Sequence, residues 1–107
     1  MRTFLLLSTL SPQGMQTIHT TPERLLEVNR EIEALGGRVV NQWALLGPYD
    51  FLSIVEAPDD RAIAKITTEL AARGSSQFET LSALSVEEFS EAVRSDPDGD
   101  AGRAPQP

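Results

Sequence analysis

The residues best suited to chemistry gather in the stretch Gly47-Pro48-Tyr49-Asp50-Phe51, which holds the only tyrosine of the chain beside an acid. A carboxylate that accepts the hydrogen bond of a phenol can fix the ring, or the pair can hold the amine of a ligand. A buried carboxylate at this position can also act as a general base. We therefore expect a small-molecule site at Tyr49 and Asp50, with binding favoured over catalysis.

Turn geometry offers a second interpretation of the same stretch. Pro48 has φ fixed at about −65°, so it cannot take the first central position of a primed hairpin turn, which needs positive φ. We expect a type I turn centred on Pro48 and Tyr49, followed by Asp50, a residue type that tolerates the left-handed conformation. This turn explains the glycine, the proline and the aspartate without a ligand, but it does not require a tyrosine.

Three further side chains are candidates for this site or for catalysis. His19 is the only histidine; it can act as an acid, a base or a metal ligand, or stay solvated beside a helix start. Trp43 suits the core, an interface or the wall of an apolar pocket. Glu79 faces outward or gives a pocket its carboxylate. The expected ligand-binding residues are Trp43, Tyr49, Asp50 and Glu79, and the candidates for proton transfer are His19 and Asp50.

Metal and cofactor sites are not expected. The chain has no cysteine, which excludes disulfides, thiolate catalysis and cysteine-based zinc sites. Residues 96–100 carry acids at alternate positions, as a calcium loop does, but Ala101 and Pro107 stand where that loop needs glycine and glutamate. No glycine-rich phosphate loop, nucleophile elbow or paired-histidine motif occurs. We predict that the protein uses no cofactor and no metal.

Length and composition bound the class of protein. A chain of 107 residues, 40% of them hydrophobic, makes one domain with a thin core. The net charge of −7 argues against nucleic acid and anionic membranes as partners. The apolar start at residues 3–10 is interrupted by Ser8 and Thr9, so it indicates a buried strand and not a signal peptide. No stretch approaches the roughly 18 apolar residues of a membrane span, and we expect a cytoplasmic protein.

The spacing of apolar residues and helix breakers predicts the elements that hold these side chains. The expected elements are a strand at 3–10, a helix from Thr20–Glu23 to Gly36, strands at 39–46 and 51–56, a helix from Asp59–Asp60 to Gly74, a strand at 77–84 and a short helix from Ser85 to Val93. Thr20 and Glu23 have capping-box spacing. Residues 11–20 are expected to be irregular, with Gly14 breaking them. The last helix should pack Val86, Phe89 and Val93 on the domain.

Composition changes after residue 94. Residues 95–107 are rich in Asp, Pro, Gly and Ala and lack apolar periodicity. Such a segment cannot bury enough apolar surface to fold. We expect one domain at residues 1–94 and a disordered acidic tail at residues 95–107.

The order of elements is that of an α+β, ferredoxin-like βαββαβ fold: a four-stranded antiparallel sheet with two helices on one face and a short extra C-terminal helix. Two short helices cannot cover all the apolar strand residues, so some of these must lie on the other face. A large exposed apolar face usually marks a partner. The expected partner is a second copy, stacked sheet on sheet, which makes the protein a homodimer or higher oligomer.

Three segments resemble the GYD domain family, which is named for a Gly-Tyr-Asp motif and belongs to the dimeric α+β barrel group. They are Gly47 to Phe51, Ile54 to Asp60 and Glu79 to Leu81. Gly47, Tyr49 and Asp50 match the motif, with Pro48 between the glycine and the tyrosine, and the resemblance spans residues 1–93. It implies the ferredoxin-like fold and, since the family as a whole has no assigned activity, little about function.

Other likenesses leave the function open. The turn is similar to one near an amino-acid effector site in the ligand-sensing domain of leucine-responsive regulators, but no helix-turn-helix precedes it here. The barrel group also includes cofactor-free monooxygenases, muconolactone isomerases and haem-degrading enzymes, and the fold does not choose among them. We expect a homo-oligomer that binds a small, partly apolar metabolite near Gly47–Asp50. The alternatives are a cofactor-independent monooxygenase- or isomerase-like enzyme and a pure oligomerisation module.

Overall fold

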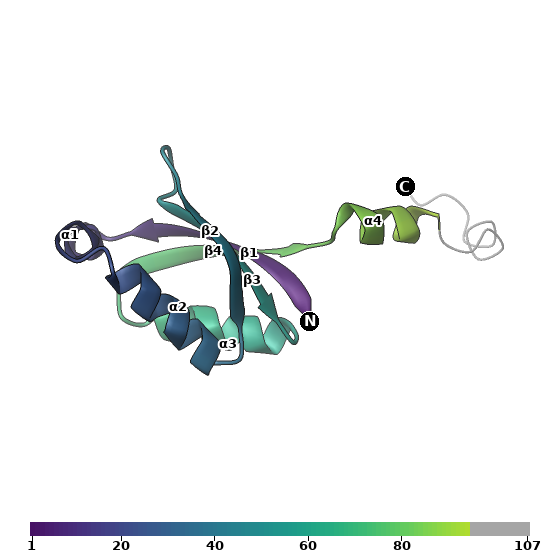
Figure 1. The fold of residues 1–107 in the computed structure, drawn as a ribbon, viewed down its shortest axis with the longest axis horizontal. Coiled ribbons are helices and arrows are strands. Elements are labelled where there is room, and N and C mark those ends of the chain that lie inside the picture. Colours follow the sequence, from purple (N-terminus) through teal and green to yellow (C-terminus); the bar gives the residue numbers. More distant parts are fainter. Residues whose placement is uncertain (95–107) are drawn as a thin grey trace.

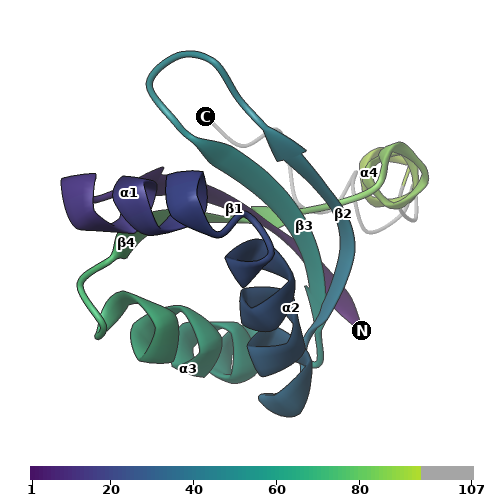
Figure 2. The ribbon, with the colours of Figure 1, turned by 60° about the vertical axis from the view of Figure 1, so that its left-hand side comes forward.

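The computed structural model describes residues 1–94; the predicted tail at residues 95–107 lies outside the described residues. The elements are β1 (Arg2–Leu10), α1 (Pro12–Thr20), α2 (Arg24–Ala34), β2 (Arg38–Ala44), β3 (Phe51–Ala57), α3 (Asp60–Ala71), β4 (Ser76–Ala83) and α4 (Val86–Val93). The four strands form one antiparallel sheet in the order β2-β3-β1-β4. Helices α1, α2 and α3 lie on one side of it (Figures 1 and 2). The predicted α+β, ferredoxin-like fold is confirmed.

The core lies between the sheet and helices α2 and α3. Every second residue of β1 and β3 faces the helices, and Phe4, Leu6 and Val55 are at most 2% exposed. They pack against Ile32 of α2 and Ile66 of α3, whose apolar residues recur at helical spacing. Full burial of one such side chain stabilises the fold by about 1.5–3 kcal/mol. The alternation in the strands therefore sets which sheet face is covered.

Helix α1 corrects the prediction that residues 11–20 are irregular. Ser11 is the N-cap and its Oγ accepts a hydrogen bond from the Gly14 N–H at 3.0 Å, while Pro12 occupies the first turn. Gly14 does not break this helix. A Cβ there would lie 2.3 Å from the Ser75 carbonyl oxygen, so glycine lets α1 lie against the residues before β4.

The predicted capping box at Thr20 and Glu23 is also wrong. Thr20 is the last residue of α1, and α2 begins at Arg24 with Glu23 as its N-cap. No side chain makes a cap hydrogen bond at that end. The physical reason is the extra helix: Thr20 belongs to α1, so it is not available to start α2.

Helix α4 has the predicted cap but not the predicted packing. Its capping box joins Ser85 and Glu88 through two hydrogen bonds of 2.9 Å. The prediction that Val86, Phe89 and Val93 pack on the domain is wrong, because they are 75%, 58% and 64% exposed. The chain after β4 leads α4 away from the sheet (Figure 1). The radius of gyration is accordingly 17.4 Å, against roughly 13 Å for a compact chain of this length.

Candidate functional site

Asp50 is a structural residue of the connection between β2 and β3. Its Oδ2 accepts a hydrogen bond from the Leu10 N–H at 2.8 Å, and its own N–H donates to the Ser8 carbonyl at 2.8 Å. Its carbonyl accepts from the Leu45 N–H at 2.8 Å, which closes the connection. Gly47, with φ of 137°, supplies a backbone conformation there that other residues rarely adopt. The carboxylate thus fastens the connection to the end of β1.

The phenol of Tyr49 pairs with a different acid from the one predicted. Tyr49 Oη donates to Glu79 Oε1 at 2.9 Å, and Glu79 lies on β4, opposite Leu7 of β1. The tyrosine side chain therefore reaches across β1 on the face away from the helices. The hydrogen bond to Glu79, followed by desolvation and the negative charge of that carboxylate, raises the pKa of Tyr49. The phenol stays protonated at neutral pH and acts as a donor.

The face of the sheet away from the helices is apolar, as predicted, and we call it the open sheet face. It consists of Leu5, Leu7, Trp43, Leu52, Ile54 and Leu81, which the strand register places on one side. Trp43 and Leu81 are each 46% exposed. Trp43 lies opposite Leu52, and the Tyr49–Glu79 pair lies on the same face beside Leu7. The structure thus brings three of the four predicted ligand-binding residues to one surface.

The candidates for proton transfer are in different surroundings. His19 is exposed in the last turn of α1, on the helix side, whereas the carboxylate of Asp50 is bonded to the end of β1. Within residues 1–94, no group of three histidine or acidic side chains is arranged to hold a metal ion. His19 and Asp50 are therefore not placed to act together as an acid and a base.

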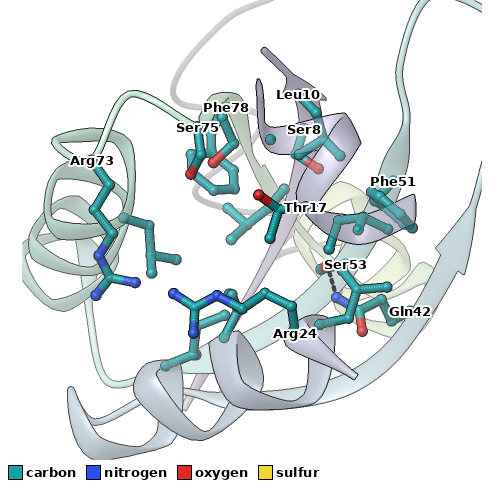
Figure 3. Close-up of a pocket in the computed structure, with 18 of the residues that line it drawn as sticks. Ser8, Leu10, Thr17, Arg24, Gln42, Phe51, Ser53, Arg73, Ser75 and Phe78 are labelled. Carbon is teal, nitrogen blue, oxygen red and sulfur yellow. Dashed lines mark hydrogen bonds between the residues drawn. The ribbon is translucent and has the colours of Figure 1, made fainter. Parts of the chain in front are cut away.

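A cavity of about 320 Å³, partly open to solvent, lies on the other side of the sheet, between the sheet and helices α1, α2 and α3 (Figure 3). Its wall includes Gln42 of β2, whose Nε2 donates to Ser53 Oγ of β3 at 2.8 Å. Asn29 of α2 donates to Gln42 Oε1 at 3.0 Å. None of the predicted site residues lines this cavity.

Sequence reasoning missed this cavity, although one signal for it exists. Ser8 and Ser53 occupy strand positions where the alternation calls for large apolar residues, and both are buried, 8% and 7% exposed. A small polar side chain at such a position leaves space beside it and needs hydrogen bonds. Two such residues on neighbouring strands indicate a hollow between the sheet and its helices.

These features define a small ferredoxin-like domain with an apolar open sheet face, a projecting helix and a cavity between the sheet and its helices. Residues 4–93 match the GYD domain, so the chain belongs to the GYD domain family. The resemblance seen in the Gly-Pro-Tyr-Asp-Phe stretch is confirmed. Within residues 1–94, no helix combines the length and hydrophobicity needed to cross a bilayer.

Two proteins of Thermus thermophilus are similar to this chain. One is named glutamine synthetase and cystathionine beta-lyase binding protein; it is 49% identical over 87 residues, which are 80% of this chain and 92% of the relative. The other is TTHA0845, whose crystal structure matches with a TM-score of 0.52 and 23% identity over 80% of this chain and 96% of that one. The second likeness supports the fold alone.

Proposed function

We propose that this chain is a self-associating protein-binding module that binds a metabolic enzyme through α4. The observation that carries the proposal is the exposed apolar face of α4, formed by Val86, Phe89 and Val93. Their spacing of three and four residues is that of a helix that inserts into a groove on its partner. A helix of eight residues is marginal in water by itself, so a packing partner would stabilise it.

The relative supports the choice of an enzyme as that partner. It is named for binding glutamine synthetase and cystathionine beta-lyase, and nearly half of its aligned residues are identical to this chain. Glu87, Glu88 and Glu91 lie on the opposite side of α4 from this apolar face. We therefore propose glutamine synthetase or cystathionine beta-lyase as the partner of this chain.

The open sheet face is the surface that we propose for self-association. Its central pairs, Leu5 with Ile54 and Leu7 with Leu52, form a continuous apolar strip across β1 and β3. A two-fold contact buries the same strip on both copies. Trp43 and the hydrogen-bonded Tyr49–Glu79 pair would then be interface residues. Aromatic residues of this kind are enriched where protein surfaces meet.

Binding to each purified enzyme from the organism that encodes this chain tests the proposal. We expect saturable binding in calorimetry, and Phe89→Asp should weaken it by about 30-fold or more, as the loss of an interface anchor does. Glu91→Ala on the same helix is the matched control and should bind nearly as the parent does. Equal affinity of the parent and Phe89→Asp, or no binding to either enzyme, would contradict the proposal.

Sedimentation of the same samples separates the two surfaces. Phe89→Asp should keep the parent's oligomeric state, whereas Leu81→Glu should dissociate it, because a charge enters the open sheet face. Thr80→Glu places the same charge on the other face of β4, where Thr80 is exposed, and should remain associated. A parent chain that associates but binds neither enzyme would favour a pure oligomerisation module.

The metabolite site predicted at Gly47–Asp50 stays a prediction. A ligand there would compete with two existing hydrogen bonds, from Tyr49 to Glu79 and from Leu10 to Asp50. The monooxygenase- or isomerase-like alternative depends on His19 or Asp50 moving a proton. Turnover of an activated phenol or lactone that disappears in His19→Ala would favour that alternative over the binding module.

A further inference from the structure

The cavity between the sheet and the helices has a cationic end. Arg24 of α2 and Arg73, which follows α3, both line it, and Figure 3 shows their guanidinium groups directed toward one another. Each guanidinium has five N–H donors. Arg24 uses one of them on Glu27 at 3.1 Å, and Arg73 uses two on Glu31. The remaining donors are sufficient for a second anion.

The two carboxylates at this end do not occupy the cavity. Glu27 and Glu31 are absent from its lining, whereas both arginines belong to it. The guanidinium of Arg73 lowers the pKa of Glu31 chiefly by hydrogen bonding, and the charge of Arg24 lowers it further. Glu31 thus lies within the field of both cations, and it holds Arg73 in position from outside. Both arginine side chains are about 40% exposed, so a ligand can reach them from solvent.

The rest of the cavity is mainly apolar. Side chains from the sheet and three helices form its wall, among them Leu6, Leu25, Val28, Phe51, Leu70 and Phe78. A volume of about 320 Å³ is at the small end of the range for ligand pockets, which begins at roughly 300 Å³. The space therefore suits a small organic molecule. An apolar wall with a few convergent polar groups is the usual composition of such a site.

Two buried serines add polar groups inside the cavity. Ser8 and Ser53 are both more than nine-tenths buried and line the wall. Ser53 Oγ already accepts a hydrogen bond from Gln42, which in turn is fixed by Asn29. Its own O–H is left to donate to a bound oxygen atom. The hydrogen bonds from Asn29 to Gln42 and from Gln42 to Ser53 fix this polar group in the cavity wall.

We propose that this cavity binds a small carboxylic acid with an apolar body, its carboxylate held by Arg24 and Arg73. A guanidinium and a carboxylate form a planar, charge-assisted pair, which fixes the orientation of the ligand. The apolar body lies against Phe51 and Phe78, with the serines beyond it. The net charge of the protein, −7, opposes anions in general, so binding depends on these two local cations. This proposal is independent of the proposed protein-binding surfaces.

The test compares 3-phenylpropanoate with 3-phenylpropan-1-ol, which has the same apolar body without the charge. Titration of the full chain is followed by amide chemical shifts in NMR. We expect saturable amide shifts at Ser8, Gln42 and Ser53. The acid should bind about tenfold more tightly than the alcohol, or more. Arg24→Met should weaken binding of the acid by about tenfold or more and leave the affinity for the alcohol unchanged. Arg30→Met is the matched control, because Arg30 is exposed on the same helix and does not line the cavity.

A second variant tests the cavity in case the substitution of Arg24 disturbs folding. Thr17 is exposed on α1 and lines the cavity, so Thr17→Trp should fill the opening and prevent binding of both compounds while the chain stays folded. Equal affinities for the acid and the alcohol would overturn the proposal. So would an equal effect of Arg24→Met and Arg30→Met, or the absence of saturable shifts in the cavity wall.

Discussion

Removal of the Asp50 carboxylate is the perturbation that separates a structural turn from a ligand site. In the structure, Asp50 Oδ2 accepts a half-buried hydrogen bond from the Leu10 N–H at 2.8 Å. Hydrogen bonds to charged groups contribute about 1.5–3 kcal/mol to stability. Asp50→Ala leaves the Leu10 amide without this partner, so we expect a loss of ~2 kcal/mol in the free energy of unfolding. For a domain of this size, that corresponds to a fall of roughly 8–16 °C in Tm.

Urea unfolding followed by circular dichroism measures this loss at a fixed protein concentration, since association also changes apparent stability. Asp50→Asn keeps an acceptor oxygen and should lose about half as much. Glu33→Ala removes an exposed acid from α2 and should stay within about 0.5 kcal/mol of the parent. If Asp50→Ala were as stable as Glu33→Ala, the carboxylate would not fasten the connection to β1, and a ligand-binding role would regain support.

Two further predictions concern a titration and a close contact. Because Tyr49 is the only tyrosine, its ionisation can be followed by absorbance: it should titrate above the usual value of about 10, and Glu79→Gln should lower its pKa again. Because the pKa of Tyr49 is higher in the folded than in the unfolded chain, the stability that this pair contributes is complete below about pH 10 and is lost as the phenol ionises. The same titration midpoint of Tyr49 in the parent and in Glu79→Gln would contradict the pairing. Gly37→Ala should lower the free energy of unfolding by about 1–3 kcal/mol in urea, because the added Cβ would lie 2.9 Å from Ile32 Cγ2 and Ile66 Cδ1. An unchanged urea midpoint would mean that these core side chains move aside at no cost in stability.

Elements fixed by local chemistry were predictable from the sequence. The cap of α3 is an example, since Asp59 Oδ1 accepts from the Ala62 N–H three residues on, at 2.9 Å. The capping box of α4 is equally local. Helix α1 was missed because Gly14 resembles a helix breaker, and its role depends on Ser75, which is distant in sequence. The packing of α4 was predicted incorrectly because an apolar helical stripe does not say which surface will cover it.

The candidate site shows the same division. Tyr49 and Glu79 were both predicted as site residues, but their hydrogen bond depends on β4 lying beside β1. The partner of the Asp50 carboxylate, Leu10, is forty residues away and belongs to another strand. The cavity was not predicted at all, because its wall combines residues from three helices and the sheet. Pairings of this kind follow from strand order, which no single segment contains.

The sequence by itself determined the fold class, the alternation that leaves one sheet face apolar and the cap of the last helix. Those features depend on residue spacing and on hydrogen bonds within a few residues. Only the tertiary structure decided that Asp50 holds the end of β1, that Tyr49 pairs with Glu79 and that Arg24 and Arg73 line the same cavity. Each of these contacts joins separate elements, and their distances depend on how the sheet and helices pack.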